Sequence, residues 1–74
     1  MMRKDLIAAY AIARNVPEAE ARQAVNTVTA LMRLALERGN GVRIRGFGEF
    51  VQSKGGVKFY QGFRVTGPDN SNPA

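Results

Sequence analysis

The chain has 74 residues, of which 11 are lysine or arginine and six are acidic, and it contains neither cysteine nor histidine. Disulfides and zinc sites built on cysteine or histidine are therefore excluded, and a chain this short buries little apolar surface unless a partner chain supports it. The net charge of +5 suggests a polyanionic partner such as a nucleic acid, although a soluble protein that merely resists aggregation would also fit it.

The first predicted element is a helix over residues 3–15. Its apolar residues recur at spacings that share one helix face, and alanine, the best helix former, fills much of the rest. Asn15-Val16-Pro17 interrupts the pattern, because proline is disfavoured inside a helix but suits the first position of the next one. The residues of the apolar face are Leu6, Ile7, Tyr10 and Ala13.

A second predicted helix begins near Pro17 and ends at Gly39. Glu18 and Glu20 place negative charge where the helix dipole is positive, and Gly39 suits the position that follows the last turn. The polar residues of this helix form one narrow stripe, so most of its surface is expected to be buried. The stripe consists of Arg22, Asn26, Thr29, Arg33 and Glu37.

The wide apolar surface of this helix predicts a homodimer, because a chain of 74 residues has too few elements to cover it. A monomer with an ordinary amphipathic helix is the alternative. The expected dimer core combines residues of this helix with two phenylalanines of the following segment. These residues are Val25, Val28, Leu31, Met32, Phe47 and Phe50.

The first predicted strand, residues 42–45, follows a glycine turn and alternates with the period of two that is typical of a half-buried strand. Gly46 and Gly48 then flank Phe47. Two glycines at this spacing indicate a tight bend or a bulge, since glycine adopts backbone angles that other residues resist.

The next residues predict a β-hairpin. The second strand is expected to run to Lys54, Gly55-Gly56 is a two-residue hairpin signal, and the third strand is expected over residues 57–65. The cross-strand pairs that this turn implies are Lys58 with Ser53 and Tyr60 with Val51.

Alternation divides the side chains of this sheet between two faces. The inner face is apolar and consists of Val42, Ile44, Val57, Phe59, Phe63 and Val65. The outer face is basic, with one aromatic residue, and only Glu49 is acidic there. A merely solvated face would usually mix both signs, so we expect this face to contact DNA phosphates. Together with the lysine near the hairpin tip, the expected DNA-contacting residues are Arg43, Arg45, Lys54, Lys58, Tyr60 and Arg64.

The order of these elements, with Gly-Phe-Gly-x-Phe following two such helices, resembles the HU/IHF family of bacterial histone-like proteins. The resemblance runs without a gap from Met1 to Phe50. It is carried by "DLI" at residues 5–7, by alanines of the second helix, by "ALERG" at residues 35–39 and by "GFGEF" at residues 46–50.

The resemblance implies an α+β fold in which two amino-terminal helices precede a three-stranded antiparallel sheet. It further implies an intertwined dimer whose helices form the body and whose two sheets form a saddle that meets double-stranded DNA. Beyond Phe50 the chain departs from the family, whose hairpin extends into long basic arms, each with a proline at the tip that wedges between base pairs. The family's carboxy-terminal helix also has no counterpart, because Thr66-Gly67-Pro68 stops any helix.

We therefore expect a histone-like protein that binds DNA with little regard to sequence, through the saddle, and bends it weakly. Residues 1–65 are expected to form this domain and residues 66–74 a disordered tail. A cytoplasmic, nucleoid-associated location follows from this function, and no apolar run is long enough to span a membrane.

Other functions remain open. One alternative is a protein-interaction module that docks on a host nucleoid protein or forms a heterodimer with a host HU/IHF-like chain. A sequence-specific regulator would need base readout, and no predicted helix carries the Asn, Gln and Arg cluster that reads a major groove. We expect no enzymatic activity, because no convincing base is present to activate a hydroxyl nucleophile. We also expect no cofactor and no metal, since histidine and cysteine are absent and the six acidic residues are scattered.

Overall fold

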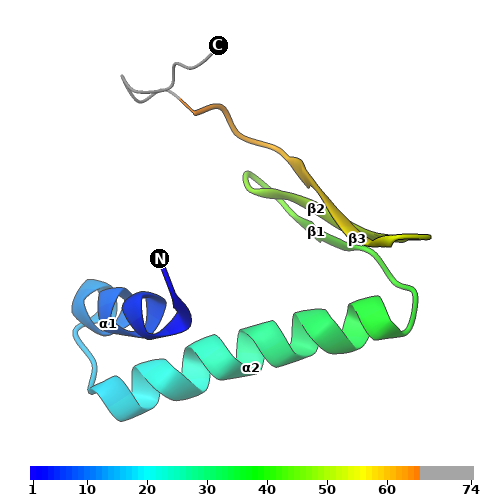
Figure 1. The fold of residues 1–74 in the computed structure, drawn as a ribbon. Helices are drawn as coiled ribbons and strands as arrows, with labels where there is room; N and C mark the ends of the chain where they lie inside the picture. Colours follow the sequence, from blue (N-terminus) through cyan, green and yellow to red (C-terminus); the bar gives the residue numbers. More distant parts are fainter. Residues whose placement is uncertain (66–74) are drawn as a thin grey trace. The chain divides into compact units, whose positions relative to one another are not determined.

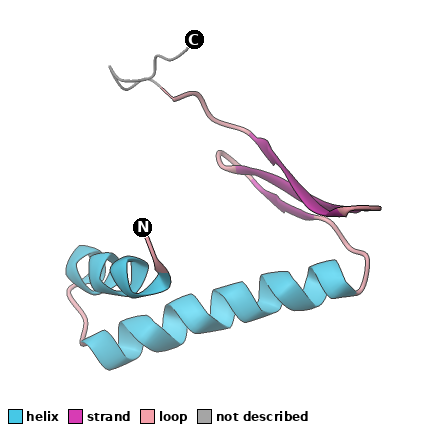
Figure 2. Ribbon diagram, in the orientation of Figure 1, coloured by secondary structure: helices cyan, strands magenta, loops and turns pink. Residues whose placement is uncertain are grey.

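The computed structural model describes residues 1–65, which form two helices followed by a three-stranded antiparallel sheet (Figure 1; Figure 2). This confirms the expected α+β class. The predicted disordered tail, residues 66–74, lies outside the described residues. The chain divides into two compact units, a helical unit of residues 1–34 and a sheet unit from residue 35 on. The elements are α1 (Arg3–Arg14), α2 (Glu18–Glu37), β1 (Val42–Ile44), β2 (Gly48–Ser53) and β3 (Gly56–Gln61).

Helix α1 is capped by local hydrogen bonds at each end. At its start, the backbone N–H of Met2 donates to Asp5 Oδ2 over 2.8 Å. The carboxylate of Asp5 also places a negative charge at the positive end of the helix dipole. At its end, Asn15 adopts the left-handed conformation with φ 55°, and its N–H group faces the last carbonyls of the helix. Asparagine tolerates this conformation better than most residues, so the predicted break after residue 15 has a clear cause.

Helix α2 begins after Pro17, whose carbonyl accepts hydrogen bonds from the N–H groups of Glu20 and Ala21, both over 3.1 Å. Its carboxy-terminal end carries the glycine motif that the sequence predicts. Gly39 has φ 84° and donates to the carbonyl of Leu36 over 3.0 Å, and Asn40 donates to that of Ala35 over 2.9 Å. This pair of bonds is the Schellman arrangement, which satisfies carbonyls that the helix end leaves open.

The sheet has the order β1-β2-β3, with β2 in the centre. Strands β1 and β2 are joined by a tight turn, in which the N–H of Phe47 donates to the carbonyl of Ile44 over 2.9 Å. Gly46 occupies the third position of this turn with φ 82°, a conformation that favours glycine. The bend expected around Gly46 is therefore a β-turn, and it places Arg45 in the turn rather than in a strand.

The register of the β2–β3 hairpin differs from the predicted one. Ser53 pairs with Gly56, so Lys54 and Gly55 form the turn, and the expected Gly55-Gly56 turn is wrong. The positive φ falls on Gly56, at 129°, and the Ser53 hydroxyl donates to the Gly56 carbonyl over 3.1 Å. The observed pairs are consequently Lys58 with Val51 and Tyr60 with Glu49. The shift is two residues, so every side chain keeps its predicted face.

Four phenylalanines form a cluster on the apolar face of the sheet. Phe50 and Phe59 lie directly opposite each other on β2 and β3, with ring centroids 4.7 Å apart. Phe47, in the turn, lies 5.2 Å from Phe59 and stacks against Phe63 at 5.7 Å with an interplanar angle of 10°. Such ring pairs add to the free energy gained by burial alone.

The third strand is shorter than the predicted residues 57–65, because β3 ends at Gln61. The N–H of Gly62 donates to the carbonyl of Phe47 over 2.8 Å, and the Gln61 side-chain amide donates to the carbonyl of Phe63 over 3.0 Å. These bonds hold the chain beside the first turn, where Phe63 can stack on Phe47. Arg64 and Val65 therefore follow the strand and are not part of it.

Candidate nucleic-acid interface

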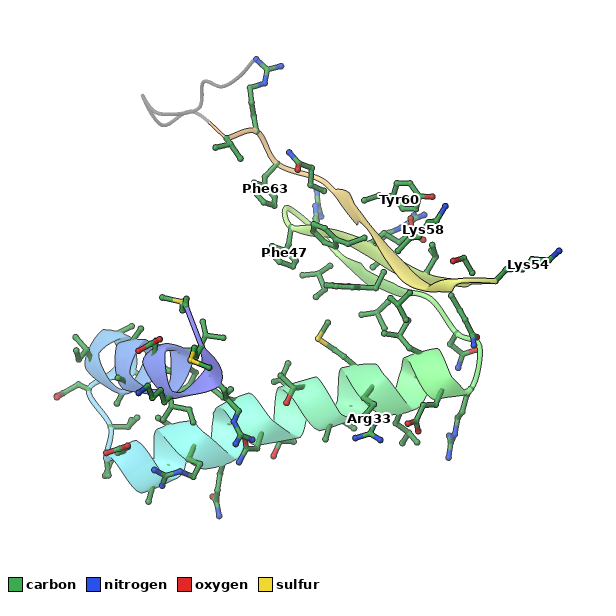
Figure 3. The ribbon with its side chains drawn as sticks, viewed as in Figure 1. Arg33, Phe47, Lys54, Lys58, Tyr60 and Phe63 are labelled. Atoms are coloured by element: carbon green, nitrogen blue, oxygen red, sulfur yellow. The ribbon has the colours of Figure 1, made fainter. Side chains whose placement is uncertain are left out.

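One face of the sheet gathers the charged residues of the strands. Arg43, Glu49 and Tyr60 occupy directly opposite positions on β1, β2 and β3, so their side chains project from the same face. Lys58 lies on the same face, opposite Val51. Figure 3 shows Lys58 and Tyr60 pointing to one side of the sheet, whereas Phe47 and Phe63 lie on the other. We call this the basic face.

The remaining predicted contacts lie at the edges of the basic face. Arg45 is in the turn between β1 and β2, and Lys54 is in the hairpin turn, where Figure 3 shows it extending from the tip. Arg64 lies beyond the end of β3, so the structure does not bring it into the sheet with the other cations. The predicted role of these residues in binding DNA remains a prediction.

Glu49 brings the one negative charge to this face among the described strands. Its Oε1 atom lies 3.5 Å from Arg43 Nη2, and both side chains are solvent-exposed enough for the pair to add little to stability. The sequence predicts Glu49 on the face but not this pair. Counting outward from the Gly46 turn would have identified it, since the turn alone fixes the β1–β2 register.

A shallow hollow opens on the basic face beside Tyr60. Three glycines leave part of its surface without side chains, and two arginines stand at its rim. Tyr60 itself is 57% exposed. The residues that line the hollow are Arg43, Ile44, Arg45, Gly46, Gly48, Glu49, Tyr60, Gln61 and Gly62.

The helical unit exposes a second kind of surface, which is apolar. Among the described residues, only Ile7 and Ala21 are fully buried hydrophobic residues, at 5% and 0% exposure. Val28 and Leu31, which the sequence predicts in the dimer core, are 55% and 60% exposed in the single chain. A hollow between α1 and α2 is almost entirely apolar and is lined by Leu6, Tyr10, Ala24, Val25, Val28 and Thr29.

The other predicted dimer-core residues are also incompletely covered by this single chain. Val25 and Met32 of α2 and Phe50 of β2 are half-buried, and Phe47 is exposed. The structure contains one chain, so their burial by a partner remains a prediction. What it does establish is that these side chains are available for one.

The helical unit also carries cations outside the sheet. Arg3, Lys4 and Arg22 line a hollow near the start of both helices, but two of them have partners there. Arg22 Nη2 lies 3.1 Å from the carboxylate of Glu18, and Arg3 donates to the side chain of Asn26 over 3.2 Å. Within residues 1–65, Arg22 is the one of these three cations with an ion-pair partner, because the side chain of Asn26 is neutral.

Two negative findings apply to residues 1–65. They contain no group of three or more His, Cys, Asp or Glu side chains placed to hold a metal ion. Neither helix is long and apolar enough to cross a membrane.

Comparisons with known proteins agree on one family. The sequence model of the family described as "Bacterial DNA-binding protein" matches residues 1–60. Among solved structures, a variant of HU from Thermotoga maritima is similar in fold, with a TM-score of 0.79 and 28% sequence identity. That match covers 84% of this chain and 89% of the other. A search of curated protein sequences found no match.

Proposed function

Because the chain belongs to the HU/IHF family of bacterial DNA-binding proteins, we propose that it binds double-stranded DNA through its basic face. The observation that carries this proposal is the placement of Arg43, Lys58 and Tyr60 on one side of the sheet. Arg45 and Lys54 extend the same charge into the two turns. A surface of this kind matches the regular row of phosphates along a duplex.

The binding is largely independent of sequence. Lysine and arginine side chains on a sheet reach phosphate oxygens, which are the same at every base pair. Base readout in the major groove instead requires an inserted helix or ribbon whose side chains meet the base edges. The described hairpin ends in Lys54 and Gly55, which offer no such set of side chains.

A second copy of the chain completes the protein. The apolar hollow between α1 and α2, together with exposed Val28 and Leu31, requires cover that this chain does not supply within residues 1–65. Large exposed apolar patches mark interaction sites. A small chain in which only two hydrophobic residues are fully buried has too small a core to be stable without a partner. A homodimer also places two basic faces on one particle, which doubles the number of phosphate contacts.

The dimer coats or bridges DNA and bends it weakly. Strands β2 and β3 are six residues each, about 20 Å long, and their turn contains no proline or large apolar side chain. Kinking a duplex requires a wedge that unstacks a base step at a cost of a few kcal/mol. This hairpin carries no residue that could act as one.

A salt titration on two unrelated duplexes tests the proposal. Arg43, Arg45 and Lys58 of two protomers supply about six phosphate contacts, which predicts a slope of log K against log salt of about −5 between about 50 and 200 mM. Both duplexes should give the same affinity within about threefold, a difference of less than one mismatched base pair in a specific site.

Substitution of Arg43 and Arg45 by alanine should weaken binding to both duplexes and flatten the slope. Arg14→Ala, which removes one exposed charge from α1, is the control and should leave the slope nearly unchanged. If all variants gave the same slope of log K against log salt, the DNA-binding site would have to lie elsewhere, at Arg3, Lys4 or Arg22. No duplex binding by a folded dimer would favour the role of an interaction module that docks on a host nucleoid protein.

A further inference from the structure

We infer that the hollow beside Tyr60 is a stacking site for an unpaired nucleobase, and that the protein binds single-stranded DNA through it. The inference rests on the proposed function in one respect, since the same arginines would hold the phosphates. It adds a ligand class that phosphate contact alone does not explain. The argument follows from Tyr60, from the glycines beside it and from the charges at the rim.

Tyr60 is an aromatic side chain without an aromatic partner among the described residues. All four phenylalanines of the sheet unit contact one another on the apolar face. Tyr60 points to the opposite face and is 57% exposed (Figure 3). An exposed ring among cations presents a flat surface on which a base can stack, which is the principal non-ionic contact in proteins that bind single strands.

Three of the residues that line the hollow are glycines. Gly46, Gly48 and Gly62 bring bare backbone to its surface. A Cβ atom at Gly46 would meet no heavy atom within 4 Å, so the space beside the turn is open. A Cβ atom at Gly48 would instead lie 2.6 Å from the Phe59 ring, on the apolar face, so the open space that a base could enter is the space beside Gly46.

The rim supplies charges for the phosphate of the same nucleotide. Arg43 and Arg45 both line the hollow. The guanidinium group of Arg43 forms an ion pair with the Glu49 carboxylate, with Nη2 and Oε1 3.5 Å apart, whereas Arg45 has no ion-pair partner among residues 1–65. Arg45 is therefore the cation best placed to neutralise a phosphate while the base lies on Tyr60.

A base inside a duplex cannot use this site, because its two faces are covered by neighbouring bases. An unpaired base in a single strand, by contrast, can present a face to an aromatic ring. Stacking on the ring of Tyr60 consequently adds to the binding of a single strand and not to the binding of a duplex interior. This difference allows the two functions to be tested separately.

Tyrosine fluorescence gives a direct readout of stacking. The chain has two tyrosines and no tryptophan, so a Tyr10→Phe variant leaves Tyr60 as the only tyrosine. Titration of this variant with a short oligothymidine strand should quench its emission, whereas an abasic strand of equal length should bind through phosphates with little quenching. Stacking is worth about 1–3 kcal/mol per base, so the oligothymidine should bind about 5- to 150-fold more tightly than the abasic strand.

Variants of Tyr60 complete the experiment. Tyr60→Ala should remove the preference for oligothymidine over the abasic strand, whereas Tyr60→Phe should retain the preference because the ring remains. Thermal unfolding followed by circular dichroism checks that each variant folds. If Tyr60→Ala fails to fold, the quenching and the two-strand comparison in the Tyr10→Phe protein decide the question.

Equal affinity for the two strands, or no quenching of Tyr60 on saturation, would overturn the inference. An RNA strand that bound more tightly than DNA of matched sequence would overturn its assignment to DNA. The proposed duplex function fails separately, by an absence of duplex binding in the unsubstituted protein. If the protein binds duplex DNA but shows no preference for oligothymidine over the abasic strand, the proposed function stands and the stacking site is refuted.

Discussion

Arg43 and Glu49 lie directly opposite each other on β1 and β2, and Arg43 Nη2 is 3.5 Å from Glu49 Oε1. In the proposed DNA interface the carboxylate would therefore compete with phosphate for one of the cations of the basic face. It also repels a phosphate that approaches from solution. Glu49 would consequently limit the affinity of the proposed interface for DNA.

Glu49→Gln should tighten DNA binding about two- to fivefold, because it removes this competition and this repulsion. Stability should change by less than about 1 kcal/mol, since exposed ion pairs contribute little. Fluorescence anisotropy with a labelled duplex measures the affinity. Glu18→Gln is a matched control, because it removes the carboxylate of the Arg22 ion pair in the helical unit with the same change of net charge. Equal effects of the two substitutions would mean that only net charge matters.

Val28→Glu should prevent dimer formation or unfold the protein, because a charge placed in the apolar hollow between α1 and α2 would be buried without a partner. Light scattering at micromolar concentration should give the unsubstituted protein a mass near twice 8.1 kDa. Gln23→Glu, at an exposed position of the same helix, should remain dimeric. A stable monomer for the unsubstituted chain, or a stable Val28→Glu dimer, would contradict the predicted interface.

The protein should bend DNA weakly. Smooth bending of a short duplex costs on the order of 1–6 kcal/mol, and a short hairpin that ends in Lys54 and Gly55 adds few contacts to offset that cost. Energy transfer between the ends of a labelled duplex of about three helical turns should rise only slightly on saturation. A large rise would show that another element kinks DNA, and Pro68→Ala and Pro73→Ala would then test the remaining prolines.

Gly48→Ala should destabilise the sheet by about 2–4 kcal/mol. Gly48 has φ 154°, and a Cβ atom there would lie 2.5 Å from the carbonyl oxygen of Tyr60 and 2.6 Å from the Phe59 ring. Urea unfolding at equal chain concentration measures the loss. Gly55→Ala is the control, since a Cβ atom at Gly55 would meet nothing within 4 Å, and its effect should stay within about 0.5 kcal/mol. A Gly48→Ala protein as stable as the control would show that the strands can separate here without cost.

The sequence was sufficient for the helices because their ends depend on local chemistry. Asn15, Pro17 and Gly39 each favour one backbone conformation, and the structure uses all three at the helix ends. The two faces of the sheet were equally predictable, since alternation survives a shift of two residues. The family could be recognised because Gly-Phe-Gly-x-Phe follows the helices at a fixed distance.

The hairpin register could not be predicted in the same way. Lys54-Gly55 and Gly55-Gly56 are both acceptable two-residue turns. The two registers differ by two residues, so the alternation of apolar and polar side chains fits both equally well. In the observed register the Ser53 hydroxyl donates to the Gly56 carbonyl and Gly48 lies opposite Gln61, and the alternating pattern predicts neither of these features. The end of β3 was missed for a related reason, because the stacking of Phe63 on Phe47 depends on a contact between residues far apart in sequence.

The near absence of buried side chains in the single chain has a consequence for its lifetime in the cell. Only Ile7 and Ala21 are fully buried among the described hydrophobic residues, so in the proposed dimer folding and pairing would be one event, and stability would rise with chain concentration. Dilute chains spend more time open to proteases, and those that have found a partner are protected. Degradation would therefore remove surplus single chains first, so that the amount of functional protein depends more steeply than linearly on the rate of its synthesis.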